Sequence, residues 1–139
     1  MTDNLFVLDT HILLWTLLDK SKLYKKEVEI IKNAQQNNKL IISSISLWEI
    51  AMLASKNKIR IYSKTEDFLK EITDIKGLNI HQIDYRVAAE SVSLLEEFHG
   101  DPADRIITAT TKLLSACLIT RDTKIINWSQ KYQMKVNCF

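Results

Sequence analysis

The chain has 139 residues, 46% of them hydrophobic, so it can build one packed core but is too short for two ordinary domains. Only two glycines and one proline occur, which excludes a flexible linker and a glycine-rich phosphate-binding loop. The formal net charge of +2 permits contact with a polyanion without demanding it. We therefore expect a single domain over residues 1–139.

The ends of the chain and its cysteines indicate the compartment. Residues 1–4 lack the basic start of a signal peptide, and the apolar runs are too short to span a bilayer. Cys117 lies in the apolar run 116–119, where a small buried thiol packs well, so Cys117 and Cys138 are both expected to be free. The N-terminus and the short apolar runs predict a cytoplasmic protein that does not contact a membrane.

The first third of the chain alternates strand and helix patterns. Residues 5–8 form a continuous apolar run of strand length, which indicates a central strand covered on both faces. Helical spacing of apolar residues follows over residues 11–19 and 27–37. Residues 39–43 repeat the apolar strand pattern.

Two capping-box sequences mark the next helices. Ser46 and Glu49 have the S-x-x-E spacing at the start of a helix expected over residues 47–57. Residues 63–66 repeat this spacing before a helix that Gly77 can close.

The middle of the chain continues with a short strand over residues 78–83. Asp84 can cap a helix that runs to about Phe98. Asp101 followed by Pro102 then forms a strong helix start, with a capping aspartate and proline at the first helical position.

The last elements complete an alternating pattern. An apolar strand is expected over residues 116–120, a helix over 125–132 and a short strand near Val136. Alternation of strands with helices is typical of an α/β fold, here a three-layer α/β/α sandwich around a mostly parallel central sheet.

Acidic residues follow or neighbour the predicted strand ends. Asp9 directly follows the first strand, Asp122 follows the strand over residues 116–120, and Glu49 and Asp104 are expected in first turns of helices at the same edge. In an open parallel sheet, ligands bind beyond the carboxyl ends of the strands. Four carboxylates are therefore expected to converge there.

Helix capping is the alternative explanation for most of these acids. Aspartate and glutamate are favoured near helix N-termini by the helix dipole and by unpaired amides, which suffices for Glu49, Asp104 and Asp122 taken singly. Asp9 is harder to explain in this way, because a carboxylate straight after a buried strand is poorly solvated unless something binds it.

Convergence of the four carboxylates would need compensation. Two unit charges about 4 Å apart repel by about 1 kcal/mol in water and about 4 kcal/mol at an effective dielectric of 20. Arg105 and Arg121 are candidate neutralising neighbours, but Mg²⁺ or Mn²⁺, which prefer oxygen ligands, would act directly. A carboxylate-bound cation can activate water and stabilise charge on a phosphodiester, so the residues predict phosphodiester hydrolysis.

Four segments together resemble the motifs of PIN domains, and especially of VapC-type toxins from bacterial toxin–antitoxin pairs. They are V-L-D-T-H over residues 7–11, S-L-W-E-I over 46–50, H-G-D-P-A-D-R over 99–105 and T-R-D over 120–122. The resemblance extends over nearly the whole chain, and the order and spacing of the set are more specific than any one segment.

The resemblance implies an α/β/α fold, Mg²⁺- or Mn²⁺-dependent cleavage of RNA, a homodimer and inhibition by a cognate antitoxin. It places the four acidic family positions on Asp9, Glu49, Asp104 and Asp122, both as metal ligands and as catalytic residues. Asp101 also lies in the third motif, but its place before Pro102 favours helix capping over metal ligation.

Several further residues have two interpretations. Thr10 can hold a carboxylate or water through its hydroxyl, or cap the helix that follows. His99 can contact substrate, although a lone histidine beside glycine is more often structural. The lysines over residues 20–26 and 56–60 can attract RNA phosphates or form a solvated face, which is the preferred interpretation.

Four large apolar residues could lie either in the core or on a surface that binds an antitoxin. These residues can form part of a groove for an antitoxin helix, but core packing is preferred for them: Trp15, Trp48, Met52 and Leu53. The acidic site could also receive a basic side chain from the antitoxin.

Two other functions remain open at this stage. A phosphatase or phosphoacceptor domain also places an aspartate after an early strand, but residues 9–11 lack a second aspartate two positions on. A non-catalytic PIN-like module that binds RNA or a protein is the other alternative, and the complete acidic set argues against it.

Overall fold

The computed structural model describes residues 4–94, 98 and 101–139. The elements run in this order: β1 (Phe6–Leu8), α1 (Thr10–Leu18), the 3-10 helix η1 (Lys20–Lys22), α2 (Lys25–Gln36), β2 (Leu40–Ser43), α3 (Ile45–Ser55), α4 (Thr65–Thr73), β3 (Leu78–His81), α5 (Tyr85–Ser93), α6 (Pro102–Leu113), β4 (Cys117–Ile119) and α7 (Thr123–Tyr132). Within the described residues, no helix is both long and apolar enough to cross a membrane.

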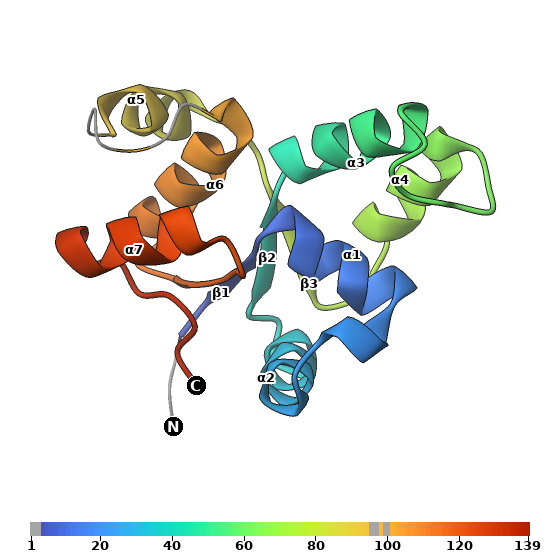
Figure 1. The fold of residues 1–139 in the computed structure, drawn as a ribbon, viewed down its shortest axis with the longest axis horizontal. Helices are drawn as coiled ribbons and strands as arrows, with labels where there is room; N and C mark the ends of the chain where they lie inside the picture. The colour runs from blue at the N-terminus through green and yellow to red at the C-terminus, as the bar shows by residue number, and fades with distance from the viewer. Residues whose placement is uncertain (1–3, 95–97, 99–100) are drawn as a thin grey trace.

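The four strands form one parallel sheet in the order β3-β2-β1-β4. Phe6 of β1 pairs with Leu40 of β2 on one side and with Cys117 of β4 on the other. The predicted parallel sheet and the central place of β1 are thus confirmed. Since all strands run the same way, their carboxyl ends meet at one edge, where β1 leads into α1 and β2 into α3 (Figure 1).

Helices cover both faces of the sheet, which confirms the α/β/α sandwich. In Figure 1, α1 to α4 lie on one side of the strands and α5 to α7 on the other. Consecutive strand residues point to opposite faces, as strand geometry requires. Leu8 packs into the core beneath α1 to α4, and Val7 packs with residues of α6 and α7. Burial on both sides explains why the strand sequences are continuously apolar.

The strand expected near Val136 is only a single parallel bridge to Leu118. The chain leaves the extended conformation at Asn137, whose φ of +50° is in the left-handed region, so the pairing cannot continue as a regular strand.

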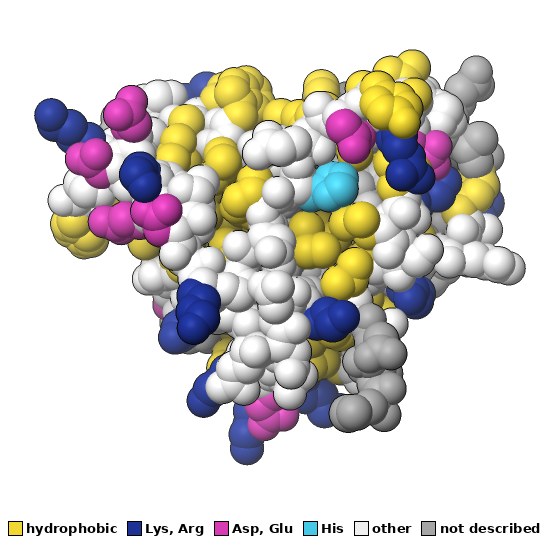
Figure 2. All heavy atoms as spheres, turned by 180° about the vertical axis from the view of Figure 1, so that it is seen from behind, with side chains coloured by type: hydrophobic (Ala, Val, Ile, Leu, Met, Phe, Trp, Pro, Cys, Tyr) yellow, Lys and Arg dark blue, Asp and Glu magenta, His cyan; other side chains and the backbone are white. Residues whose placement is uncertain are grey.

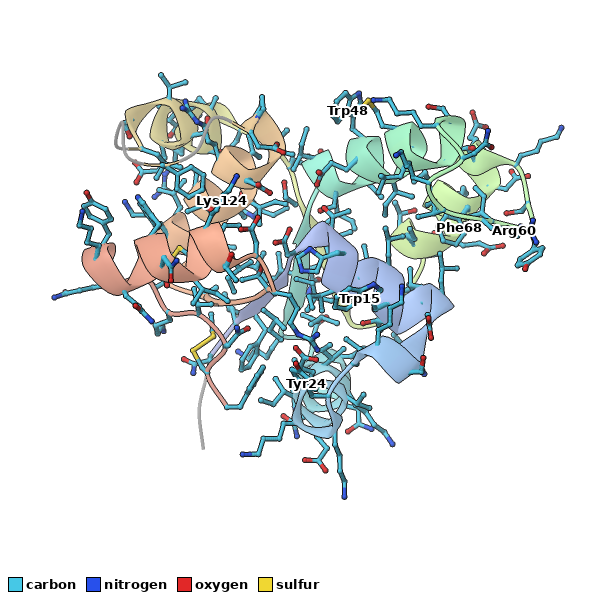
Figure 3. The ribbon with its side chains drawn as sticks, in the orientation of Figure 1. Trp15, Tyr24, Trp48, Arg60, Phe68 and Lys124 are labelled. Atoms are coloured by element: carbon cyan, nitrogen blue, oxygen red, sulfur yellow. A yellow bond between two sulfur atoms is a disulfide. The ribbon has the colours of Figure 1, made fainter. Side chains whose placement is uncertain are left out.

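The expectation of two free thiols is wrong, because Cys117 and Cys138 form a disulfide with their Cα atoms 6.3 Å apart. The yellow bond in Figure 3 shows it near the C-terminal end of the chain. The cysteines are 21 positions apart in sequence, and the return of the chain beside β4 after α7 is what brings them together.

Gly77 does not end α4, which stops at Thr73. It lies in the turn before β3 with φ +88°, and a Cβ there would be only 2.2 Å from the carbonyl oxygen of Gln35. Close approach to α2 therefore requires glycine at this position.

Candidate active site

Asp9 lies where β1 passes into α1, and its side chain is fixed on both oxygens. Oδ1 accepts a hydrogen bond from the Thr10 amide at 2.8 Å, and Oδ2 accepts one from the Thr120 hydroxyl at 2.7 Å. Nδ1 of His11 is 3.7 Å from Oδ2. Asp9 is only 3% exposed, so this carboxylate is held in one orientation and shielded from bulk water.

Glu49 belongs to the site and not to a helix cap, so the capping-box prediction for it is wrong. Helix α3 begins at Ile45, which puts Glu49 in the second turn. The Thr10 hydroxyl donates a hydrogen bond to Glu49 Oε1 and is 2.8 Å from the Ser46 hydroxyl. Since Thr10 has one hydroxyl proton, Ser46 is the donor to Thr10. Thr10 therefore holds a carboxylate, one of the two roles considered for it.

The pKa of Glu49 shows that other carboxylates are near. It rises from an ordinary value of 4.5 to about 7, chiefly because burial disfavours the charged form. The hydrogen bond from Thr10 lowers this pKa, whereas the negative charges of Asp9, Asp104 and Asp101 raise it further. Asp9 and Asp104, two of the acids expected to converge, therefore act on Glu49, and so does Asp101, which was expected only as a helix cap.

Asp101 and Asp104 reach this site from the start of α6. Asp101 caps the helix as expected, accepting from the amides of Ala103 at 3.0 Å and Asp104 at 3.4 Å. Asp104 follows in the first turn. Asp101 thus caps α6, as predicted. Its negative charge also acts on Glu49, which the prediction of a cap did not include.

Asp122 lies at the same sheet edge but is set apart from Glu49. Its Oδ1 caps α7, accepting from the amides of Lys124 at 2.8 Å and Ile125 at 3.3 Å. Its own amide donates to the Thr120 hydroxyl at 3.0 Å. It is not among the acids whose charge raises the pKa of Glu49. Thr120, which sequence reasoning missed, therefore connects Asp122 to Asp9.

Arg121 does not neutralise the acidic site, contrary to expectation. Its guanidinium forms an ion pair with Glu27 of α2, and its Nε donates to Glu27 Oε2 at 3.0 Å. It also lies over the rings of Tyr24, 3.8 Å from the ring centre, and Trp15, at 5.1 Å. The backbone at Arg121 does approach the site, because its amide donates to Nε2 of His11 at 3.0 Å.

The oxygen atoms that could ligate a metal at the site suit a hard divalent cation. They are carboxylate and hydroxyl oxygens. Burial is the chief cause of the raised pKa of Glu49, and the negative charges of neighbouring acids, which a cation would relieve, raise it further. Among the described residues, no three His, Cys, Asp or Glu side chains are arranged to hold a metal ion by themselves. Mg²⁺ commonly keeps several waters and takes only one or two carboxylates, so the donor set fits such an ion.

An apolar groove borders the carboxylates between α3 and α6. Its volume is about 500 Å³, and Trp48, Met52 and Pro102 line it beside Glu49 and Asp101. Trp48 is 55% exposed and points outward from α3 in Figure 3, so the core-packing prediction is wrong for this residue.

The other members of that apolar set, and the lysine runs, have different surroundings. Leu53 packs against the core as expected, and Trp15 is half-buried. Lysines of both runs are exposed. In Figure 2 acidic and basic side chains stand together over α4. His99 lies outside the described residues.

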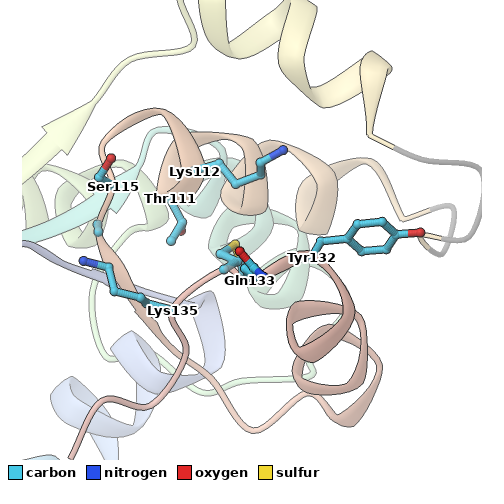
Figure 4. A pocket seen from close by; sticks show the side chains of 8 residues that line it. Thr111, Lys112, Ser115, Tyr132, Gln133 and Lys135 are labelled. Atoms are coloured by element: carbon cyan, nitrogen blue, oxygen red, sulfur yellow. The ribbon is translucent and has the colours of Figure 1, made fainter.

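A second hollow lies at the opposite edge of the sheet. It is about 200 Å³ in volume and is formed by the end of α6 and the chain after α7 (Figure 4). Lys112 and Lys135 line it, and none of its lining residues is acidic. The carboxylate site and the α3–α6 groove are therefore the better candidate for chemistry.

Comparison with known proteins agrees with this geometry. The sequence pattern of the PIN domain family matches residues 6–129. Ribonuclease VapC22 of Mycobacterium tuberculosis is 29% identical over 120 residues, which are 86% of this chain and 88% of that protein.

Solved structures give a similar result. A toxin–antitoxin complex from Klebsiella pneumoniae contains a chain 27% identical to this one, with a TM-score of 0.58 and coverage of 85% of this chain and 87% of that chain. VapBC2 from Rickettsia felis, bound to a DNA fragment from its promoter, contains a chain with a TM-score of 0.69 at 17% identity, covering 96% and 97% of the two chains.

The resemblance drawn from the four sequence segments is thereby confirmed. The matched region contains all four acidic positions and every strand of the sheet. The chain belongs to the PIN domain family.

Proposed function

We propose that this chain is a metal-dependent endoribonuclease toxin of the VapC type, folded as a single domain and acting in the cytoplasm. The observation that carries the proposal is that the negative charges of Asp9, Asp104 and Asp101 all act on Glu49, whose pKa is raised to about 7 chiefly by burial and further by these charges. Among the described residues, no lysine or arginine pairs with Asp9 or Glu49. The family and the relative named as a ribonuclease support RNA as the substrate.

One or two of the carboxylates of Asp9, Glu49 and Asp104, together with waters, would hold Mg²⁺ or Mn²⁺, with Asp122 as the fourth catalytic acid. When bound, such an ion supplies activation of a water and stabilisation of the charge that grows on the phosphodiester. The hard oxygen donors and the charge relief at Glu49 support this choice of cation.

The protein residues have separate tasks in this proposal. Thr10 and Thr120 orient Asp9 through its two oxygens, so no reorganisation of that carboxylate is needed during cleavage. In the metal-free site Glu49 can exchange a proton near neutral pH because its pKa is about 7, and it would lose that proton on binding a cation. Asp122 sets the start of α7 and, through Thr120, the position of Asp9.

A cognate antitoxin is the proposed partner, with the α3–α6 groove as its docking surface. The exposed Trp48 supplies apolar area, and Glu49 and Asp101 beside it would receive a basic side chain. The solved structure from Klebsiella pneumoniae, with a chain 27% identical to this one, is a toxin–antitoxin complex, which supports this partner. We also propose that the toxin is a homodimer.

RNA cleavage by the purified chain tests the proposal. Cleavage is expected with Mg²⁺ or Mn²⁺, and a chelator should stop it. An Asp9→Asn variant should be inactive, whereas Asp84→Asn, which alters a cap on α5 away from the site, should cleave like the wild type. Mapping of RNA ends after induced expression supplies the natural substrate.

Two results would contradict the proposal. Undiminished cleavage by Asp9→Asn would remove the assigned site. Absence of cleavage together with absence of any thermal stabilisation by millimolar Mn²⁺ would favour a non-catalytic binding module.

A further inference from the structure

One asparagine connects the C-terminal segment to the acidic site. Oδ1 of Asn137 accepts from the amide of Thr120 at 3.1 Å, and Nδ2 of Asn137 donates to the carbonyl of Thr120 at 3.0 Å. The side-chain amide thus pairs with the Thr120 backbone in the way that a neighbouring strand would. Because β4 ends at Ile119, this pairing extends its ordered edge by one residue.

Thr120 is the residue that carries this constraint into the site. It is fully buried, and its hydroxyl donates to Asp9 Oδ2 at 2.7 Å while accepting from the Asp122 amide at 3.0 Å. A buried backbone amide and carbonyl need partners, and Asn137 supplies one for each in Thr120. The position of the Thr120 hydroxyl therefore depends on Asn137.

Asn137 is itself held in place from both sides. Its amide donates to the carbonyl of Leu118 at 2.8 Å, and the next residue, Cys138, is joined to Cys117 by the disulfide. Its φ of +50° is a conformation that asparagine tolerates better than most residues. The local backbone thus directs this side chain onto Thr120.

We propose that Asn137 is a positioning residue for Asp9, acting through Thr120; the inference rests on the proposed metal-dependent function. Partners that orient ligating carboxylates commonly contribute roughly 10- to 100-fold in metal affinity. Thr120 is such a partner of Asp9, and Asn137 is one link further away. We expect loss of the Asn137 side-chain amide to weaken metal binding roughly 3- to 10-fold.

Asn137→Gly removes the amide without introducing backbone strain, because glycine adopts positive φ freely. Asn57→Gly is the matched control, since Asn57 has φ +56° at the exposed end of α3, away from the site. Titration calorimetry with Mn²⁺ should give weaker binding for Asn137→Gly and unchanged binding for Asn57→Gly. RNA cleavage should show a lower kcat for Asn137→Gly with little change in KM.

A double variant tests whether the effect passes through Thr120. Thr120→Val removes the hydroxyl that holds Asp9, so adding Asn137→Gly to it should weaken Mn²⁺ binding no further. Fully additive losses would overturn the pathway through Thr120.

The amide NMR signal of Thr10 gives a readout that needs neither metal nor activity. This amide donates to Asp9 Oδ1 at 2.8 Å, so its chemical shift reports the position of the carboxylate. The signal should move in Asn137→Gly and stay in Asn57→Gly. If the wild type fails to bind Mn²⁺ or to cleave RNA, the proposed function fails, and this signal still decides the positioning role. An unmoved Thr10 signal overturns that role.

Discussion

Glu27 and Asp9 are both buried carboxylates, but their neighbours differ. Glu27 is 1% exposed, forms an ion pair with Arg121 and accepts the Tyr24 amide at 2.7 Å. The hydrogen bond and charge of Glu27 in turn raise the pKa of the Arg121 guanidinium. Asp9 is 3% exposed and receives neutral donors, the Thr10 amide and the Thr120 hydroxyl.

The difference separates a structural carboxylate from a reactive site. The chain places a fixed guanidinium against Glu27, so that charge is compensated in the folded protein. Around Glu49, burial and the negative charges of neighbouring acids together raise its pKa. Acids whose negative charges act on one another in this way are typical of sites that bind a cation.

Arg121→Ala should break the structural pair and give the largest effect. Removal of one partner leaves Glu27 charged and buried, which we expect to cost about 3 kcal/mol in the free energy of unfolding. Urea denaturation at pH 7 measures it, with the exposed Lys124→Ala as control (Figure 3). Equal midpoints for the two variants would mean that the pair adds no stability.

Substitution of single acids should sharpen the boundary of the reactive site. Asp104→Asn should lower RNA cleavage about 100-fold, because Asp104 is among the acids that act on Glu49. Asp122→Asn should lower it only about 10-fold, since Asp122 is not among the acids whose charge acts on Glu49 and asparagine can keep the cap that its Oδ1 gives α7. Initial rates at saturating Mg²⁺ compare the two, and the reverse order would place Asp122 closer to the chemistry.

Binding of Mn²⁺ at the acidic site should raise the free energy of unfolding, and this gain should not depend on the Arg121–Glu27 ion pair. At a free Mn²⁺ concentration of ten times Kd, ligand linkage predicts a gain of about 1.4 kcal/mol. Thermal unfolding with and without Mn²⁺ measures this gain. Arg121→Ala should retain it and Asp9→Asn should lose it; the same gain in both variants would argue for metal binding elsewhere.

The smallest expected effect concerns the pH dependence contributed by Glu49. Because folding raises its pKa from 4.5 to about 7, the neutral form is favoured in the folded state. The contribution to stability is therefore complete below about pH 4.5 and is lost as the pH rises through about 7.

Glu49→Gln should remove this dependence. We expect a melting temperature a few degrees higher than that of the wild type at pH 8, with little difference at pH 4, and no RNA cleavage. Melting curves without metal across this pH range measure the difference. An identical pH profile for the two proteins would mean that Glu49 titrates normally.

Local sequence features determined much of the fold and part of the site. Continuous apolar runs predicted the strands because these are covered on both faces, and Asp9 was predicted from its place after β1. Asp84 and Asp101 were predicted as helix caps because capping depends on residues within one turn. Each of these signals is local.

Only the tertiary structure decided which side chains meet. Glu49 fits a capping box in sequence, but its partner is Thr10, 39 positions earlier. The hydroxyl of Thr120 donates to Asp9, which is 111 positions earlier in the sequence. Arg121 pairs with Glu27, which is 94 positions earlier. Asn137 contacts Thr120 because the chain returns beside β4 after α7. The sequence by itself therefore determined the elements and the acids at the sheet edge. The pairing of charges and hydroxyls followed from strand order and helix packing, because contacts between distant residues leave no periodic pattern in the chain.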